Sequence, residues 1–180
     1  MLLIVDPQID FISGTLPVPG AEEAMKELAT YIQEHDGDYC LKVVTTDWHP
    51  YHHHSFEPQG GQWPVHCVQN TVGAAIHPSL VTPLYTTKGE VKVLRKGVYA
   101  DREEYSIFKN RDSSQYLQEM VSLLGIQQID LCGIAGDICV LNTLKDGVAL
   151  FRAGRFKVLH QYSPSLDGGK ALNEYVGSLR

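Results

Sequence analysis

The sequence has no long apolar run. Its first apolar stretch, Leu2 to Val5, is interrupted at once by Asp6. A membrane-spanning helix needs about 20 apolar residues, and a secretory signal needs an apolar stretch of about 7 to 15. We therefore expect neither a membrane segment nor export.

Basic residues are also scarce. Lysine and arginine total 15 against 21 acidic residues, which gives a formal net charge of -6, and no basic run occurs. This balance argues against a nucleic-acid or anionic-membrane partner.

The cysteines form no C-x-x-C pair, which suits a reducing compartment better than a disulfide framework and favours the cytoplasm. They are Cys40, Cys67, Cys132 and Cys139.

Two nucleotide-binding motifs are missing as well. No G-x-G-x-x-G follows the first apolar run and no G-x-x-x-x-G-K-[ST] occurs, so a dehydrogenase or a P-loop enzyme is disfavoured.

The chain has 180 residues, 43% of them hydrophobic. We predict one domain over residues 1–180 that buries about 70% of its unfolded surface. Such a domain needs no metal to fold, so a metal site would serve chemistry.

Short apolar runs alternate with longer amphipathic stretches. This alternation predicts a doubly wound α/β domain in which helices flank a mainly parallel sheet. The expected strands are Leu2–Asp6, Cys40–Thr46, Val91–Arg95, Ile129–Ile134 and Phe156–His160. The expected helices are Ala21–Glu34, Ser113–Leu124, Asp137–Arg152 and Gly169–Val176. Residues 49–87 show no long periodic segment and are predicted to be a functional loop.

Three residues with catalytic chemistry follow expected strands. Asp6, Lys96 and Cys139 can meet at one edge of the sheet, where doubly wound folds bind ligands. Singly, each has an ordinary explanation as a turn residue, a surface lysine or a buried thiol. Together they supply a nucleophile, a proton acceptor and a positive charge. We expect Lys96 and a helix N-terminus to lower the pKa of the thiol, and burial to raise that of Asp6.

Histidines cluster between residues 47 and 66, where five of the eight occur beside Asp47. We predict that Pro50 begins a short helix, which would place His49 and His53 on one face. Three imidazoles and one carboxylate suit zinc, iron or manganese. Spacing alone does not show which of His52, His53 and His54 is a ligand. The alternative to a metal site is an exposed polar loop with solvated histidines. The five are His49, His52, His53, His54 and His66.

Five blocks occur in order along the chain: Ile4–Phe11, Asp47–Phe56, Trp63–Cys67, Lys96–Gly97 and Gly133–Val140. Together they resemble the nicotinamidases (pyrazinamidases) of the isochorismatase-like hydrolase superfamily, from Leu3 to about Val148. The resemblance implies a catalytic triad of Asp6, Lys96 and Cys139. It also implies a divalent metal ion, zinc in the first place, and selects His53 from its neighbours. The implied ligands are Asp47, His49, His53 and His66.

The resemblance further implies a cis peptide between Ile134 and Ala135, and an oxyanion hole formed by the backbone N–H groups of Ala135 and Cys139. Phe11 and Trp63, aromatic residues in loops, are expected to flank the substrate ring, with Tyr105 beside them. Two segments depart from the family pattern. They are the charged insert Ala100–Glu104 and the tail from His160 to Arg180.

The implied reaction is hydrolysis of nicotinamide, and also of pyrazinamide, to the acid and ammonia through a thioester, as a step of NAD salvage. A homo-oligomer is compatible with the sequence. One alternative is an isochorismatase-like hydrolase acting on another small amide. A second is a metal-binding or sensing protein without catalysis, which would leave Cys139 unreactive.

Overall fold

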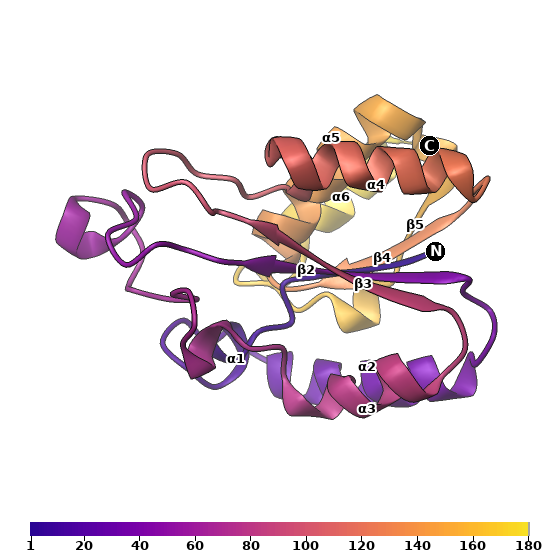
Figure 1. The fold of residues 1–180 in the computed structure, drawn as a ribbon, viewed down its shortest axis with the longest axis horizontal. Helices are drawn as coiled ribbons and strands as arrows, with labels where there is room; N and C mark the ends of the chain where they lie inside the picture. Colours follow the sequence, from indigo (N-terminus) through magenta and orange to yellow (C-terminus); the bar gives the residue numbers. More distant parts are fainter. Residues whose placement is uncertain (180) are drawn as a thin grey trace.

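Five parallel strands form the centre of the protein, described here for residues 1–179 in a computed structural model (Figure 1). Their order across the sheet is β3-β2-β1-β4-β5. This confirms the predicted doubly wound α/β fold, and each strand lies within two residues of its expected bounds. The strands are β1 (Leu2–Val5), β2 (Leu41–Asp47), β3 (Glu90–Lys96), β4 (Ile129–Gly133) and β5 (Phe156–Val158).

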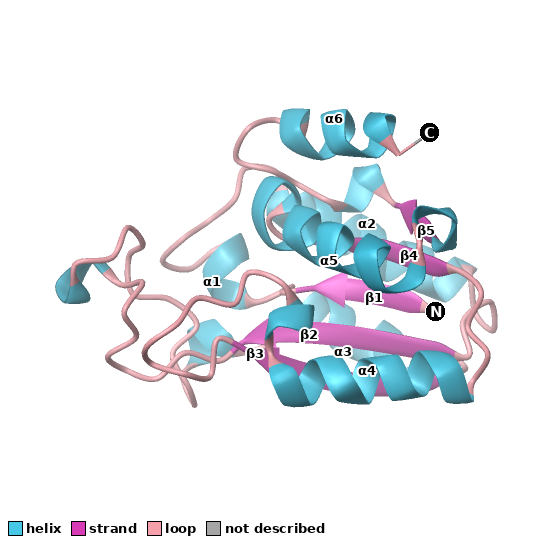
Figure 2. Cartoon of the chain, turned by 90° about the horizontal axis from the view of Figure 1, so that it is seen from above, coloured by secondary structure: helices cyan, strands magenta, loops and turns pink. Residues whose placement is uncertain are grey.

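Helices cover both faces of the sheet (Figures 1 and 2). On one face lie α2 (Ala21–Glu34) and α3 (Pro78–Thr86), and on the other α4 (Arg111–Leu123), α5 (Leu141–Phe151) and α6 (Lys170–Ser178). The short α1 (Ile9–Ile12) follows β1. The three central strands are buried along their whole length, because a parallel sheet covered on both faces has no solvated side. Hydrophobic cores therefore form on both faces of the sheet.

Four elements differ from expectation. The first is α1, which places Phe11 in a short helix rather than in a loop. The region predicted to lack a long periodic segment contains α3, which has Pro78 in its first turn and Pro83 in its interior and buries Leu80 and Leu84. Prolines obscured this helix, although Pro78 at the start is favourable. No helix begins at Pro50; the chain makes a turn there, with the His53 N–H donating to the Pro50 carbonyl. The helix predicted from Asp137 starts as a π-helical turn, Gly136–Val140, before α5.

The strand order sets the place of the site. The chain runs from β1 outward through β2 to β3 and then returns to the other side of β1 as β4. Such a reversal opens a crevice at the carboxyl ends of the strands. The segments after β1, β2, β3 and β4 all reach this end (Figure 1). In the described residues, no helix is both long and apolar enough to cross a membrane.

Candidate active site and metal centre

A buried ammonium group lies at the meeting point of these strand ends. Lys96 Nζ is 2.7 Å from Asp6 Oδ2, 2.7 Å from Asp47 Oδ1 and 3.5 Å from Cys139 Sγ. Lys96 and Asp6 are both 0% exposed. The structure thus brings the three predicted triad residues together and adds Asp47 as a second carboxylate on the lysine.

Asp6 is held where the chain leaves β1. Its φ of 48° places it in the left-handed region, which is uncommon for a residue other than glycine and ends the strand sharply. The Thr45 hydroxyl donates to Asp6 Oδ1 at 2.7 Å. Oδ2 accepts no hydrogen bond in the described structure and has only the ion pair with Lys96. One carboxylate oxygen of Asp6 and the Cys139 sulfur lie within 4.8 Å of each other, so Asp6, together with Asp47, is a carboxylate beside the thiol proton.

Burial and charge oppose each other on these groups. Burial acts to lower the pKa of Lys96, but Asp47 and Asp6 outweigh it and hold that pKa well above its usual value. Burial raises the pKa of Asp6 to about 6, although Lys96 pulls it down. The pKa of Asp47 is lowered, because Lys96 and His49 together outweigh its burial. The lysine is thus a lasting cation between two carboxylates.

The thiol differs from the sequence-based expectation. Burial raises the pKa of Cys139 well above its usual value; Lys96 lowers it, and Asp6 and Asp47 raise it. Lys96 acts on the thiol pKa in the expected direction, but burial, together with Asp6 and Asp47, outweighs it, so the expected net lowering is wrong. Cys139 also lies inside the π-helical turn rather than at its first residue, so the N-terminal end of the helix favours a thiolate less. The sulfur keeps its proton until a base removes it.

The turn that carries Cys139 has the expected backbone. The peptide between Ile134 and Ala135 is cis, as predicted. Gly133 has a φ of 125°, and a Cβ there would lie 2.1 Å from the Val5 carbonyl oxygen, so only glycine fits against β1. The Ala135 N–H has no acceptor within the described residues, and Ala135 lines the same pocket as Cys139. This N–H can serve an oxyanion.

Asp47, His49 and His66 form a second cluster beside the lysine. One ligand atom from each lies within 4.8 Å of the others. His49 Nδ1 is 3.0 Å from the Gly97 carbonyl and His66 Nδ1 is 2.7 Å from the Pro64 carbonyl. Because a carbonyl only accepts, both Nδ1 atoms carry a proton, and in the neutral rings each Nε2 keeps a lone pair. Two imidazoles fixed in this way and a carboxylate fit a divalent metal ion.

His53 stands apart from this cluster. Its ring centroid is 4.2 Å from that of His49, but its Nε2 donates to the Arg102 carbonyl at 2.9 Å and its Nδ1 pairs with the Ser55 hydroxyl at 2.6 Å. Both nitrogens are therefore engaged. His52 and His54 are exposed, as an ordinary polar loop would have them.

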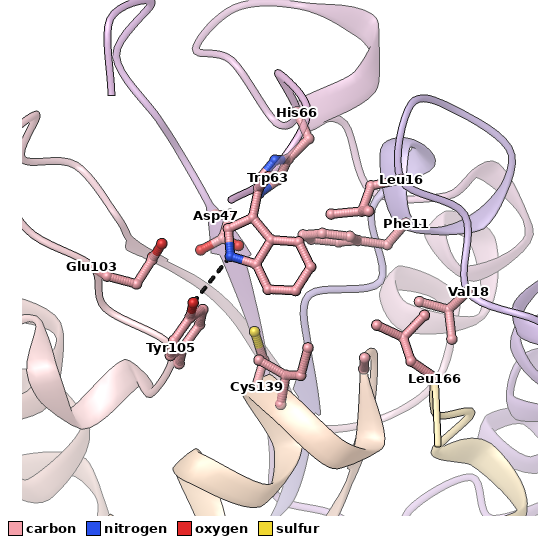
Figure 3. A pocket seen from close by; sticks show the side chains of 12 residues that line it. Phe11, Leu16, Val18, Asp47, Trp63, His66, Glu103, Tyr105, Cys139 and Leu166 are labelled. Carbon is pink, nitrogen blue, oxygen red and sulfur yellow. Dashed lines mark hydrogen bonds between the residues drawn. The ribbon is translucent and has the colours of Figure 1, made fainter. Parts of the chain in front are cut away.

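One pocket joins the two clusters (Figure 3). Phe11, Trp63 and Tyr105 all line it, together with Cys139. The Trp63 indole N–H donates to the Tyr105 hydroxyl at 3.0 Å, which holds two of the aromatic walls together. The predicted aromatics are thus brought to one apolar cavity that is open to both the thiol and the metal cluster.

Sequence reasoning missed several residues of this site. Gln8 is fully buried; its Nε2 donates to the Asp47 carbonyl at 2.8 Å and its Oε1 accepts from the Asp47 N–H at 2.7 Å. Glu103 lines the pocket, and Leu166 reaches it from the C-terminal segment. Gln8 could have been suspected as an uncharged polar residue directly after a buried strand. The other two carry no local signal in the sequence.

Comparisons with known proteins agree with this geometry. The sequence profile of the isochorismatase domain matches residues 1–150. A nicotinamidase of Saccharomyces cerevisiae is 33% identical over 99% of this chain and 94% of its own length. A nicotinamidase/pyrazinamidase of Mycobacterium tuberculosis is 37% identical over 82% of this chain and 77% of its own.

Solved structures are similar as well. The pyrazinamidase of Pyrococcus horikoshii, solved in complex with zinc, has a TM-score of 0.82 at 31% identity and covers 99% of this chain and 94% of its own. The protein PnC1 from L. infantum, solved in complex with nicotinate, has a TM-score of 0.83 at 29% identity, covering 99% and 88%.

Proposed function

Since the chain belongs to the isochorismatase domain family, we propose that it is a nicotinamidase, a cysteine hydrolase that converts nicotinamide to nicotinate and ammonia. The observation that carries this proposal is the position of Lys96, which is paired with Asp6 and 3.5 Å from the Cys139 sulfur at the wall of an aromatic pocket. A carboxylate base, an ammonium group and a thiol nucleophile side by side are the groups that acyl transfer to sulfur requires.

The first half of the reaction forms a thioester. Asp6 takes the proton of Cys139 as the sulfur attacks the carboxamide carbon, so that the thiolate, whose free form burial disfavours, does not accumulate. The N–H groups of Ala135 and Cys139 donate to the oxyanion. When the C–N bond breaks, the nitrogen leaves as ammonia with the proton from Asp6. The acyl group then remains on sulfur.

The second half returns the enzyme to its starting state. Asp6, ionised again, takes a proton from a water molecule that attacks the thioester carbon. The C–S bond breaks, nicotinate forms, and the proton goes from Asp6 to the Cys139 sulfur. Lys96 keeps its charge throughout, because two carboxylates hold its pKa above the working range.

We assign a divalent cation, zinc in the first place, to Asp47, His49 and His66. When bound, it supplies positive charge that offsets Asp47 and a Lewis acid for the ring nitrogen of the substrate, directly or through water. His53 remains the predicted fourth ligand, and to bind the metal through Nε2 it has to release the Arg102 carbonyl. His53→Ala and His49→Ala therefore make a discriminating pair: equal losses of zinc affinity would establish His53 as a ligand.

Phe11, Trp63 and Tyr105 are assigned to the substrate ring, for which a planar pyridine or pyrazine is the fitting shape. The resulting proposal includes pyrazinamide as a second substrate. Release of nicotinate suits NAD salvage, and the free cysteines suit a reducing compartment, for which we propose the cytoplasm. We propose small molecules rather than nucleic acids or membranes as partners.

Ammonia release from nicotinamide by the purified, zinc-loaded protein tests the activity. Cys139→Ala should lower the rate at least about a thousand-fold, as expected for loss of a nucleophile. The matched control is Cys40→Ala, which removes an exposed thiol and should leave the rate unchanged. A Cys139→Ala protein that still releases ammonia at the normal rate would refute the nucleophile.

Benzamide separates the rival hydrolase from the proposed one, because it has the amide and the ring but no ring nitrogen. A nicotinamidase should strongly prefer nicotinamide and lose activity to a chelator, with recovery on adding zinc. Equal rates on both amides, indifferent to chelator, would favour the other small-amide hydrolase. Zinc binding without alkylation of Cys139 or ammonia release would favour the metal-binding protein.

A further inference from the structure

Residues 97–105, here called the anchor segment, run from the end of β3 beside the histidine-rich loop. Three of their carbonyls accept hydrogen bonds from that loop. Gly97 O accepts from His49 Nδ1 at 3.0 Å, and Arg102 O accepts from His53 Nε2 at 2.9 Å. Ala100 O accepts from the His54 N–H at 2.9 Å. The position of the histidine loop therefore depends on where the anchor segment lies.

One buried carboxylate pins this segment to the body of the protein. Glu104 is 1% exposed, and its Oε2 accepts from the Gly97 N–H at 2.7 Å and from Asn110 Nδ2 at 3.0 Å. Asn110 in turn caps α4, accepting the Ser113 N–H at 3.1 Å. A continuous chain of hydrogen bonds thus leads from the start of α4 through Glu104 to the backbone beside Lys96.

The peptide that Glu104 holds lies against the segment that carries Asp47 and His49, two of the three residues of the metal cluster. The Lys96 carbonyl, on the same peptide as the Gly97 N–H, accepts from the Trp48 N–H at 2.9 Å, between Asp47 and His49. Gly97 has a φ of 64°, and a Cβ there would lie 2.5 Å from the His49 ring. With so little space, a shift of this peptide would displace the His49 ring, and the backbone of Lys96 would move with it.

We propose that Glu104 is a positioning residue of the metal centre, which fixes His49 through Gly97 and keeps Lys96 in place. This proposal rests on the proposed function, because that function gives the metal centre its use. Its test measures zinc binding and does not require that function. Groups that orient metal ligands typically contribute about 10- to 100-fold in affinity or activity. A carboxylate suits this role because its hydrogen bonds to N–H donors are stronger than those of a neutral acceptor. This proposal gives a function to the charged insert Ala100–Glu104, which departs from the family pattern.

Zinc affinity, measured by competition with a chromophoric chelator on metal-free protein, is the direct test. Glu104→Ala should weaken zinc binding about 10- to 100-fold. Glu104→Gln, which keeps an acceptor oxygen at the same reach, should bind within about threefold of the unmodified protein. Glu104→Asp, which keeps the charge but withdraws the oxygen by one methylene, should fall between them and serves if the alanine variant does not fold.

A merely structural role predicts a different pattern. Asp130→Ala is the matched control, because it removes another buried carboxylate with two hydrogen-bond donors, at the other end of the sheet. Both alanine variants should lower the melting temperature, and only the Glu104 variant should lose zinc affinity. Unchanged zinc binding in Glu104→Ala or Glu104→Asp would overturn the proposal, as would absence of zinc binding by the unmodified protein. If zinc binding depends on Glu104 but no nicotinamide is hydrolysed, only the proposed function fails.

Discussion

Asp6 shows how one carboxyl group can be buried and yet remain a base. Its burial raises the pKa to about 6, whereas Lys96 and the Thr45 hydroxyl both act to lower it. As a base, Asp6 must be ionised to take the thiol proton, so activity is lost as the pH falls through the pKa. We expect kcat/KM at saturating zinc to decline below about pH 6, not below the ordinary aspartate value of about 4.

Thr45→Val provides the control for this pH dependence. The substitution removes the hydrogen bond that favours the charged form of Asp6. The acidic limb of the pH profile, where kcat/KM falls with decreasing pH, should therefore move to higher pH, while the activity at alkaline pH changes little. A limb that stays in place in this variant, or that lies near pH 4 in the unmodified protein, would show that another group governs it.

Some residues of the site could be predicted from the sequence alone, and others could not. Asp6, Lys96 and Cys139 could be predicted because each lies at or after the end of a strand, because together they supply a base, a cation and a nucleophile, and because the resemblance implied them as a triad. Glu104 could not, since it looks like one more charge in an exposed insert, and its burial depends on Asn110 and on the return of the chain to α4. The pKa of Cys139 was predicted in the wrong direction because the sequence did not reveal how completely the thiol is buried, nor that Asp47 is a second carboxylate beside it.

At the scale of elements, the segment from Ser163 to Gly169 closes one side of the pocket. Asp137, in the turn that carries the nucleophile, accepts the N–H groups of Leu166 and Asp167 at 3.1 and 3.2 Å. The Gly136 N–H donates to the Pro164 carbonyl at 2.8 Å. These bonds hold Leu166 against the pocket, although residues 151–180 lie outside the match to the family profile.

We therefore expect Leu166→Ala to raise KM for nicotinamide about three- to tenfold with little change in kcat, because the lost contact is made equally in ground state and transition state. Steady-state kinetics on nicotinamide measure the split. Leu150→Ala, which truncates an exposed leucine of α5, is the matched control and should leave both constants unchanged. A fall in kcat with constant KM would place Leu166 in the transition state instead.

At the scale of the whole molecule, the two ends of the sheet have different tasks. The carboxyl ends carry the site, and the strand order β3-β2-β1-β4-β5 places these ends side by side; the alternation of strands and helices predicts a parallel sheet but not this order. The amino ends hold a buried network. The Tyr39 hydroxyl donates to Asp130 at 2.6 Å and also pairs with the Tyr31 hydroxyl at 2.6 Å. Burial, then Asp130, raise the pKa of Tyr39, so it keeps its proton and remains a donor.

Tyr39→Phe tests whether this end serves stability alone. The substitution leaves the Asp130 carboxylate with one donor fewer in a buried position, which should lower the free energy of unfolding by about 1–3 kcal/mol. Because the network meets none of the groups around Lys96, kcat/KM on nicotinamide should stay the same. Denaturant unfolding of the variant gives the first quantity, and Tyr51→Phe, at a side chain 72% exposed, should change neither. A loss of activity in folded Tyr39→Phe protein would mean that the two ends of the sheet are coupled, and the separation of stability from catalysis along the strands would be wrong.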